Sequence, residues 1–285
     1  MLLKIANIII KLNNPHNPTL TTLLKEYIIE EGNEDVIIDI KVNNNIPLPK
    51  EDVYGPYKNY YYSEDSDGTL NTYAIPEGFD RCLLKCSVCD NGKNASIEII
   101  DLSDVIVEFN LGEYMITAIG LVFVKLILKY NGFVIHGSSI SYNDNGIIFS
   151  AKSGTGKSTQ TKLWLDNLDD VILVNDDTPA ITFEDDGVYL NGTPFAGTTG
   201  INTNVKVPLK ALIFIERSSK PYIERLSFKD AIPRFMDEMK KSLVSDNISL
   251  CVDYAAKLME KVPVYLLHCN MEKESVEVLK NKLEI

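Results

Sequence analysis

Eight residues near the middle of the chain have the types and the spacing of a phosphate-binding loop. They read AKSGTGKS and occupy positions 151–158. Such a loop needs glycines where backbone amides converge on phosphate oxygens, a lysine to reach the terminal phosphates, and a hydroxyl to hold magnesium. Gly154 and Gly156 meet the first need, Lys157 the second and Ser158 the third. The nucleotide contacts expected from the pattern are Ser153, Gly154, Thr155, Gly156, Lys157, Ser158 and Thr159.

The segments on both sides of this loop suit the same chemistry. The run GIIFSA before it has the pattern of a strand, and TKLWLDNL after it has the pattern of a helix, so the loop would lead into a helix N-terminus. The first position of the strict pattern is Ala151 instead of glycine, which is a permitted but looser match. The sequence therefore predicts that ATP and Mg²⁺ bind at this loop.

Two adjacent carboxylates end the next apolar run, VILVNDD, which delivers Asp176 and Asp177. Neighbouring side chains on a strand point to opposite faces, so one carboxylate can face a metal ion while the other faces elsewhere. An acid beside Mg²⁺ and a second acid that accepts a hydroxyl proton would form a phosphoryl-transfer site. Two solvated acids at a turn are the plainer alternative.

The chain has three histidines, and His136, in VIHGSS, is the one placed just ahead of the phosphate-loop strand. An isolated histidine on a strand is more often structural than catalytic. His16 and His268 are interpreted as structural. We expect the imidazole of His136 to lie against Asp176.

Three of the five cysteines form the run CLLKCSVC, with Cys82, Cys86 and Cys89 at the spacing that can hold a four-iron cluster. The apolar residues Cys82, Leu84, Cys86 and Val88 occupy every second position, which instead favours a half-buried strand in which cysteine acts as a small apolar residue, and we prefer that interpretation. An odd number of cysteines without a secretion signal indicates a reducing compartment, the cytoplasm.

Composition excludes several classes of partner. The chain has 285 residues, of which 45% are hydrophobic, and its formal charge is −12, so it reads as a soluble globular protein that would repel a nucleic-acid backbone. The most apolar run, residues 115–130, carries Lys125 and is shorter than the ~20 residues that span a bilayer. We expect a buried helix there and no membrane partner.

The predicted fold class is α/β (α+β), with a β-rich N-terminal region over residues 1–110 and a nucleotide-binding domain over residues 111–285. The opening run MLLKIANIIIKLNN is interpreted as a first strand. Two β-runs joined by the turn SYNDNG, with Asp144, Asn145 and Gly146 as turn formers, predict a hairpin before the phosphate loop. Helices are expected over 227–241 and 246–260 and at the C-terminal end, and strands over ALIFIER and VPVYLLHC.

The order IHGSSI, hairpin, SAKSGTGKST and VNDD resembles that of HPr kinase/phosphorylase and of the wider group that shares its nucleotide domain with ATP-dependent phosphoenolpyruvate carboxykinase. The resemblance covers about residues 130–220. It implies a phosphate loop between strands of a mixed sheet. It also implies that Lys157 and Ser158 bind nucleotide and magnesium, that Asp176 is the base with His136 as its polarising neighbour, and that Asp177 is a metal ligand. The loop 191–204 would close over the substrate, with Thr198 and Thr199 where a basic residue is expected.

The resemblance implies a kinase that transfers the γ-phosphate of ATP to a hydroxyl, such as a serine, of a protein, peptide or small molecule. A peptide or a carrier protein is the expected acceptor, and assembly into a homo-oligomer is left open. A non-catalytic ATP-binding regulatory protein is the first alternative. A carboxykinase-type lyase is the second, although the extra lysine, histidine and arginine ligands that such an enzyme needs are not evident in the sequence.

Overall fold

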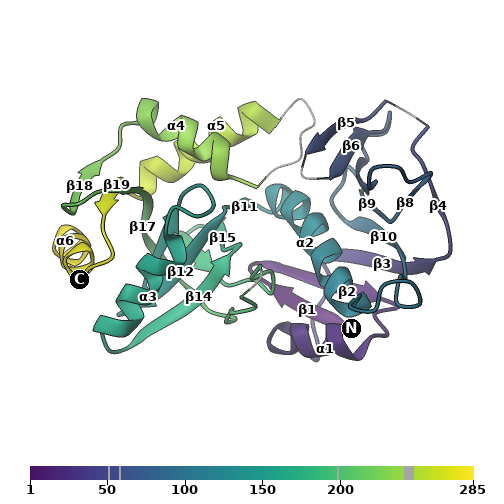
Figure 1. Cartoon of the computed structure of the whole chain (residues 1–285), viewed down its shortest axis with the longest axis horizontal. Helices are drawn as coiled ribbons and strands as arrows, with labels where there is room; N and C mark the ends of the chain where they lie inside the picture. Colours follow the sequence, from purple (N-terminus) through teal and green to yellow (C-terminus); the bar gives the residue numbers. More distant parts are fainter. Residues whose placement is uncertain (51, 58, 198, 241–246) are drawn as a thin grey trace. The chain divides into compact units, whose positions relative to one another are not determined.

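The computed structural model of the chain describes every residue except 51, 58, 198 and 241–246. It divides into two compact units. Unit 1 contains residues 1–130, and unit 2 contains residues 131–240 and 248–285. Each unit combines a β-sheet with helices, so the fold is mixed α/β (Figure 1).

Unit 1 is built on a sheet that mixes parallel and antiparallel strand pairs. Within the described residues it has eight strands, in the order β1-β2-β3-β10-β9-β7-β6-β5. β3 runs parallel to β2 and β10, and the other neighbours are antiparallel. The elements of unit 1 are β1 (Leu2–Ile5), β2 (Ile8–Asn13), α1 (Pro18–Leu24), a 3₁₀ turn (Lys25–Tyr27), β3 (Val36–Asn43), β4 (Ile46–Pro47), β5 (Tyr54–Tyr57), β6 (Tyr60–Glu64), β7 (Leu70–Ala74), β8 (Arg81–Cys82), β9 (Leu84–Val88), β10 (Asn94–Ile100) and α2 (Leu111–Lys129).

The opening residues form a hairpin instead of the single strand expected from their apolar pattern. β1 and β2 pair antiparallel, with Ile5 opposite Ile8, and Ala6 in the turn has a φ of +52°. The run contains no glycine or proline, which are the strongest local signals for a turn. The apolar pattern therefore continues across the turn and does not reveal it. The turn results from the pairing of the two strands.

Helix α2 belongs to unit 1, so the chain divides after Tyr130 and not at residue 110, where the change of sequence pattern had placed the boundary. The helix is long and apolar enough to cross a membrane, but more than half of it is buried inside the structure. Its Lys125 Nζ donates to the Leu70 carbonyl oxygen at 3.2 Å, and its Ala118 carbonyl lies 3.8 Å from Cys86 Sγ. The expectation of a buried helix is therefore confirmed.

The cysteine run lies in strands, as preferred from its alternation. Cys82 ends β8 and Cys86 lies in β9, and both are fully buried, whereas Cys89 lies beyond the end of β9. Burial raises the pKa of Cys86 to about 12, so its thiol is neutral. Within the part of the chain that the structure describes, no group of three or more His, Cys, Asp or Glu side chains is arranged to hold a metal ion.

Unit 2 is also built on a mixed sheet. Its described residues form nine strands, with the path β11-β15-β16-β17-β13-β12-β14, and with β19 on β17 and β18 on β19. β17 runs parallel to β13 and β19, whereas β12 runs antiparallel to β13 and β14. The elements of unit 2 are β11 (Gly132–Val134), β12 (Gly137–Tyr142), β13 (Asn145–Ser150), α3 (Lys157–Asn167), β14 (Val171–Asp177), β15 (Ala180–Phe183), β16 (Val188–Asn191), β17 (Lys206–Arg217), β18 (Tyr222–Arg225), α4 (Phe228–Glu238), α5 (Asn247–Lys261), β19 (Val264–Cys269) and α6 (Glu274–Leu283).

The predicted hairpin before the glycine-rich segment is present as β12 and β13. Tyr142 pairs with Asn145, so the two central turn residues are Asn143 and Asp144, with φ of +48° and +58°. This is the geometry of a type I′ turn, which matches the twist of the flanking strands. The turn lies slightly earlier than the residues that the sequence had suggested. β13 has one antiparallel and one parallel neighbour, so the expected mixed sheet is confirmed.

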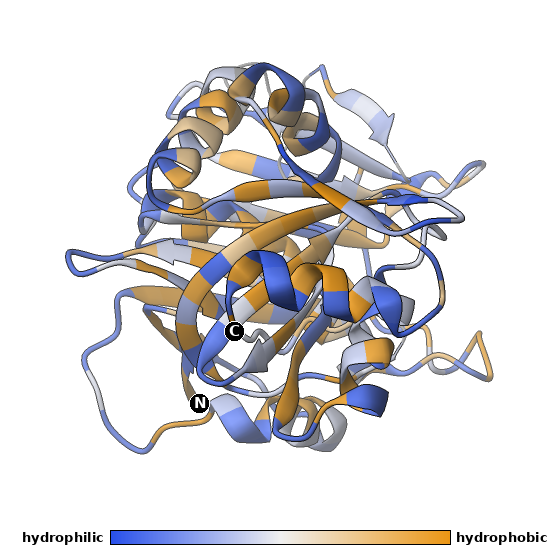
Figure 2. Cartoon of the chain, turned by 90° about the vertical axis from the view of Figure 1, so that its left-hand side faces the viewer, coloured by the Kyte–Doolittle hydropathy of each residue, from blue (hydrophilic) through white to orange (hydrophobic). Residues whose placement is uncertain are grey.

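Helices α3 and α6 pack on the apolar core of unit 2. Trp164 of α3 is fully buried beside Phe149 of β13, with ring centroids 6.5 Å apart. Leu279 and Leu283 of α6 join the same core. Figure 2 shows the resulting pattern on the helix beside the C label, where apolar and polar residues alternate. This packing fixes α3, and with it the segment that precedes α3, relative to the sheet.

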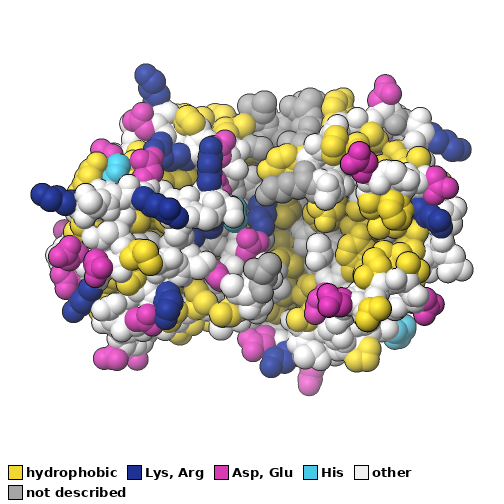
Figure 3. All heavy atoms as spheres, viewed as in Figure 1, with side chains coloured by type: hydrophobic (Ala, Val, Ile, Leu, Met, Phe, Trp, Pro, Cys, Tyr) yellow, Lys and Arg dark blue, Asp and Glu magenta, His cyan; other side chains and the backbone are white. Residues whose placement is uncertain are grey.

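Charged side chains are interspersed on the surface of unit 2. On the face seen in Figure 3, lysine and arginine side chains lie among aspartate and glutamate side chains. This agrees with the scattered lysines of an acidic sequence.

Candidate functional site

One edge of the unit 2 sheet brings together three segments that are separated in the sequence. Gly137, the first residue of β12, pairs with Ser150 at the end of β13 and with Asp177 at the end of β14. The glycine-rich loop, residues 151–156, leaves from the first of these strand ends, and the paired aspartates lie at the second. His136 directly precedes Gly137. The site residues expected from the sequence therefore gather at this edge.

The glycine-rich loop joins β13 to α3 through two residues with positive φ. Gly154 has a φ of +78° and Gly156 of +126°, which residues with a side chain rarely adopt. Gly156 is also the N-cap of α3 and has no side chain to cap the first amides. Ser153 and Thr155 complete the loop, and Thr159 lies in the first turn of α3. Open amides at the positive end of a helix dipole favour an anion.

Lys157 begins α3 and reaches back across the loop. Its side chain is 9% exposed, and its Nζ donates to the carbonyl oxygen of Ala151 at 2.8 Å. Burial lowers the pKa of Lys157, while the charges of Glu238, Asp177 and Asp176 oppose this effect. The amine is therefore held at the loop, where it can donate a charge-assisted hydrogen bond to a bound anion.

Ser158 and Asp176 form the pair that suits a metal ion. The hydroxyl of Ser158 donates to Asp176 Oδ1 at 2.8 Å. Asp176 reaches it because β14 lies beside α3 and the alternation of the strand turns Asp176 away from the face of Asp177. A hydroxyl and a carboxylate are oxygen ligands of the kind that Mg²⁺ prefers, and Mg²⁺ takes its remaining ligands from water and phosphate. This donor set therefore fits Mg²⁺ bound with a nucleotide.

His136 lies against Asp177, and not against Asp176 as we had expected. A bend at His136 interrupts the strand between β11 and β12, and the ring reaches the second carboxylate. Its Nε2 lies 3.6 Å from Asp177 Oδ1, and its Nδ1 lies 2.8 Å from Glu238 Oε2. Each ring nitrogen thus faces a carboxylate, and the backbone amide of His136 also donates to the Glu238 carbonyl. The ring is held at both ends.

Asp177 has a basic partner on its other oxygen. Lys240 Nζ donates to Asp177 Oδ2 and to Thr178 Oγ1, each at 2.8 Å, and Thr178 Oγ1 donates to the same carboxylate oxygen at 2.6 Å. Burial raises the pKa of Asp177, but Lys240, Thr178 and His136 together hold it below the ordinary value. The carboxylate is therefore charged near neutral pH and fixed in orientation.

Glu238 and Lys240 are two residues of this site that the sequence did not reveal. Glu238 is the last residue of α4, and Lys240 lies two residues beyond it. The segment after α4 pairs with the chain beside β11 through the bridge between Ile135 and Met239 and the bond from Lys240 N to the Val134 carbonyl. Locally, the run MDEMKK reads as the polar end of an amphipathic helix. Their partners, His136 and Asp177, lie 102 and 63 residues away in the chain, so the local pattern of the run does not indicate these contacts.

The loop 191–204 runs beside β14, and this puts it next to the aspartates. Ile201 O accepts from the Asp176 amide, and Thr203 N donates to Val174 O. Gly197, with a φ of +58°, lies so close that a Cβ on it would be 3.0 Å from the Cβ of Asp177. Thr199 Oγ1 donates to the Ala196 carbonyl, whereas Thr198 lies outside the described residues. The basic group near Asp177 comes from Lys240 and not from this loop.

The other histidines differ in their surroundings. His268 stacks on Tyr222 and lies 3.1 Å from Glu224 Oε1, in a surface pair far along the sheet from Asp177 in strand order. Its structural interpretation stands as a prediction, as does that of His16.

Comparisons with known proteins give little beyond this geometry. No family model matches the sequence, and no curated protein matches it. Among solved structures, the Hpr(Ser) kinase/phosphatase from Coxiella burnetii is similar, with a TM-score of 0.32 and 12% sequence identity over 53% of this chain and 92% of that chain. The function therefore has to be inferred from the residues of the site.

Proposed function

We propose that the chain is an ATP-dependent phosphotransferase of the HPr kinase-like type, which transfers the γ-phosphate to a hydroxyl group. The acceptor would be a serine of a protein or peptide, or a hydroxyl of a small molecule. One observation supports this most strongly: in the first turn of α3, directly after the glycine-rich loop, Ser158 donates a hydrogen bond to Asp176, and a second carboxylate, Asp177, lies beside His136. A phosphate loop, a metal-type donor pair and an acid–base pair are the parts that phosphoryl transfer needs.

The glycine-rich loop and Lys157 would bind the phosphates. The amides of the loop and of the first turn of α3 would surround the phosphates, and the Lys157 ammonium would pair with the terminal ones. Ser158 and Asp176 would hold Mg²⁺, which supplies charge neutralisation on the phosphates when bound. This moves the metal role from Asp177, where the family resemblance had placed it, to Asp176.

Asp177 is then the proton acceptor. The acceptor's hydroxyl oxygen forms a bond to the terminal phosphorus while the bond from that phosphorus to the β–γ bridging oxygen breaks. The hydroxyl proton passes to the Asp177 carboxylate, and ADP and the phosphorylated acceptor are released. A carboxylate of low pKa suffices because little proton transfer is needed before a loose transition state is reached. His136 and Glu238 hold this carboxylate in position.

Lys240 supplies the basic group that the loop 191–204 lacks. Its Nζ lies 2.8 Å from Asp177 Oδ2, so it is placed to neutralise the charge that gathers on a phosphoryl group in transfer. We also place the reaction in the cytoplasm, because all five cysteines are free.

Three variants test the proposal with γ-labelled ATP, a panel of serine-containing peptides and carrier proteins, and calorimetry of ATP with Mg²⁺. Lys157→Ala should lose nucleotide affinity and transfer together. Asp176→Asn should weaken Mg²⁺-dependent binding. Asp177→Asn should keep nucleotide affinity but lose about 10²–10⁴-fold in transfer. Wild-type transfer by Asp177→Asn would refute the assignment, and ATP binding without transfer to any acceptor would favour a regulatory protein.

A further inference from the structure

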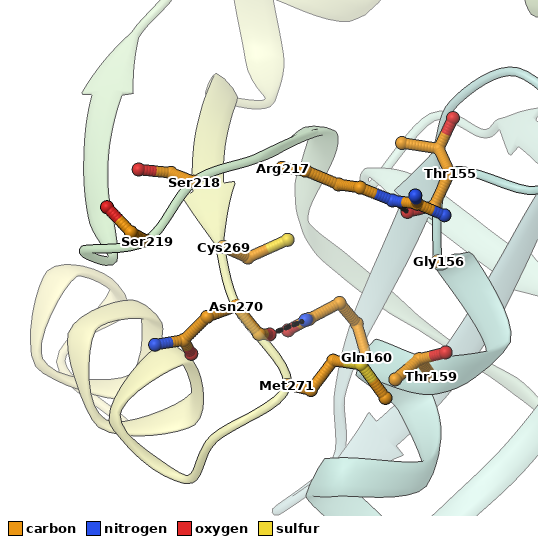
Figure 4. Close-up of a pocket in the computed structure, with 10 residues that line it drawn as sticks. All are labelled: Thr155, Gly156, Thr159, Gln160, Arg217, Ser218, Ser219, Cys269, Asn270 and Met271. Atoms are coloured by element: carbon orange, nitrogen blue, oxygen red, sulfur yellow. Dashed lines mark hydrogen bonds between the residues drawn. The ribbon is translucent and has the colours of Figure 1, made fainter.

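A cavity of about 510 Å³ lies next to the glycine-rich loop (Figure 4). Its walls come from the ends of β17 and β19 and from the residues that follow β13, β17 and β19, which are parallel neighbours in the sheet. The chain therefore leaves all three strands at the same edge, and crevices outside the carboxyl ends of parallel strands are where α/β proteins commonly bind ligands. The volume falls within the range of about 300–1,000 Å³ that is typical of small-molecule sites.

The cavity adjoins the proposed phosphate site. Thr155 and Gly156 of the loop and Thr159 of α3 form one of its walls. Arg217 at the end of β17 holds the loop there, because its guanidinium donates to the carbonyl oxygens of Gly154 and Thr155. These carbonyls are thus engaged with a cation and do not oppose a bound anion. A ligand with its phosphates on the loop would extend its remaining part into the cavity.

The opposite wall combines soft apolar groups with small polar ones. Cys269 ends β19 and Met271 lies just after it, and Ser218 and Ser219 follow β17 (Figure 4). Burial raises the pKa of Cys269 to about 11, and Arg217 only partly offsets this, so the thiol is neutral near pH 7. Polarisable sulfur-bearing side chains make favourable contacts with aromatic rings. This wall therefore suits a planar group better than a further phosphate.

Gln160 has a buried side-chain oxygen without a hydrogen-bond partner among the described residues. This residue of α3 lines the cavity and is only 2% exposed. Its Nε2 donates to the Asn270 carbonyl at 2.9 Å, which fixes the orientation of the amide because a carbonyl can only accept. Among the described residues, its Oε1 is buried without a hydrogen-bond partner. A buried acceptor without a donor is unfavourable, so a ligand that brings an N–H or O–H group here would relieve it.

We propose that this cavity is the nucleoside subsite of the donor and that Gln160 Oε1 accepts a hydrogen bond from the nucleoside. The inference rests on the proposed function and adds to it the residues that distinguish the nucleoside of the donor from inorganic triphosphate. Both ligands present the same phosphates to the loop. Only a nucleoside carries a planar base for the Cys269 and Met271 wall together with ribose hydroxyls or a base amine for Gln160.

Calorimetry of Mg·ATP and Mg·triphosphate with the full chain tests this. The wild type should bind ATP at least about tenfold more tightly than inorganic triphosphate. Gln160→Leu should remove most of that preference and leave triphosphate binding unchanged. Ser219→Trp, which fills the cavity from an exposed position, should act in the same direction. Asn167→Leu, on the same helix but outside the cavity wall, is the control and should leave both affinities unchanged.

The outcomes separate this inference from the function on which it rests. Equal affinity of the wild type for ATP and triphosphate would overturn the nucleoside subsite and leave the phosphate site standing. Binding of neither ligand would overturn both. Two analogues identify the group that donates to Gln160: deoxy-ATP lacks a ribose hydroxyl, and inosine triphosphate lacks the base amine. The analogue that lacks the donating group should bind the wild type weakly. Its affinity should not fall further in Gln160→Leu. Unchanged ATP binding by both Gln160→Leu and Ser219→Trp would also refute the inference.

Discussion

Asp177 is the most constrained side chain of the site, because three different segments fix it. Lys240 and Thr178 bind one carboxylate oxygen, His136 faces the other, and Gly197 packs on its Cβ. A base that is held in this way loses little entropy on reaching the reactive geometry. A change in any one of these contacts should therefore shift the carboxylate.

Gly197→Ala should slow phosphoryl transfer without weakening ATP binding. The new Cβ would lie 3.0 Å from Asp177 Cβ, in a backbone with a φ of +58°, so the carboxylate or the loop must move. Displacement of a catalytic group by a few tenths of an ångström costs on the order of tenfold or more in rate. Gly200→Ala is the matched control, because Gly200 has a φ of +65° and no atom within 4 Å of its added Cβ. Equal effects of the two variants on kcat would indicate loop strain alone.

Glu238→Gln should lower kcat and change its pH profile, with ATP affinity retained. The substitution keeps an oxygen near His136 Nδ1 but removes the negative charge 2.8 Å from the ring. The ring then loses a charge-assisted hydrogen bond, which weakens its hold on Asp177, and a loss of about 10–100-fold in kcat is expected. Glu260→Gln on the exposed side of α5 serves as control. A normal kcat and an unshifted profile in Glu238→Gln would assign Glu238 to docking α4 alone.

At the scale of elements, helix α2 buries the amine of Lys125, and among the described residues no carboxylate forms an ion pair with it. Lys125 is 3% exposed, and its amine donates to the Leu70 carbonyl. Burial lowers the pKa of Lys125 to about 8, partly offset by Cys86. The helix thus buries an amine that is charged at neutral pH at a cost in stability.

Lys125→Met should stabilise the protein at pH 7 by roughly 1–3 kcal/mol. The pKa of Lys125 is lower in the folded chain than in the unfolded one, so between about pH 8 and 10.5 the unfolded state binds one more proton. Wild-type stability should therefore rise with pH across that window, and the advantage of Lys125→Met should shrink. Urea unfolding at pH 7 and pH 10 measures this difference. Lys129→Met on the same helix, where Nζ pairs with Asp90 at the surface, should show no such pH dependence.

At the scale of the whole molecule, the chain has two units, each built on a large mixed sheet, and the proposed chemistry lies entirely in unit 2. The single tryptophan, Trp164, is buried in the core of that unit and lies on the helix that follows the glycine-rich loop. Its fluorescence therefore reports the unfolding of unit 2. Far-UV circular dichroism reports both units together.

Mg·ATP at about one hundred times its dissociation constant should raise the Trp164 melting midpoint by about 5–10 °C. A ligand that binds only the folded state stabilises it by about 2.7 kcal/mol at that concentration. Lys157→Ala should abolish the shift, because the charge that pairs with the phosphates is removed. An unchanged midpoint in the wild type at millimolar Mg·ATP would contradict nucleotide binding to unit 2.

The sequence by itself determined the local parts of this protein. The strand before the glycine-rich loop, the helix after it, the β12–β13 hairpin and the strand that ends at Asp177 all follow from periodicity and turn residues within a few positions. The burial of Cys82 and Cys86 followed from the same alternation. Such features depend on neighbours along the chain, so they can be read from the chain.

Only the tertiary structure decided which groups meet. The bend at His136 set the ring against Asp177 and not Asp176, and the docking of α4 brought Glu238 and Lys240 to the same edge. The attachment of α2 to unit 1 moved the boundary between the units past residue 110. These outcomes depend on how distant surfaces pack and on hydrogen bonds between segments far apart in the chain. A local sequence pattern indicates neither, because the sequence of a polar helix end or of an apolar helix shows the same pattern whichever segment it packs against.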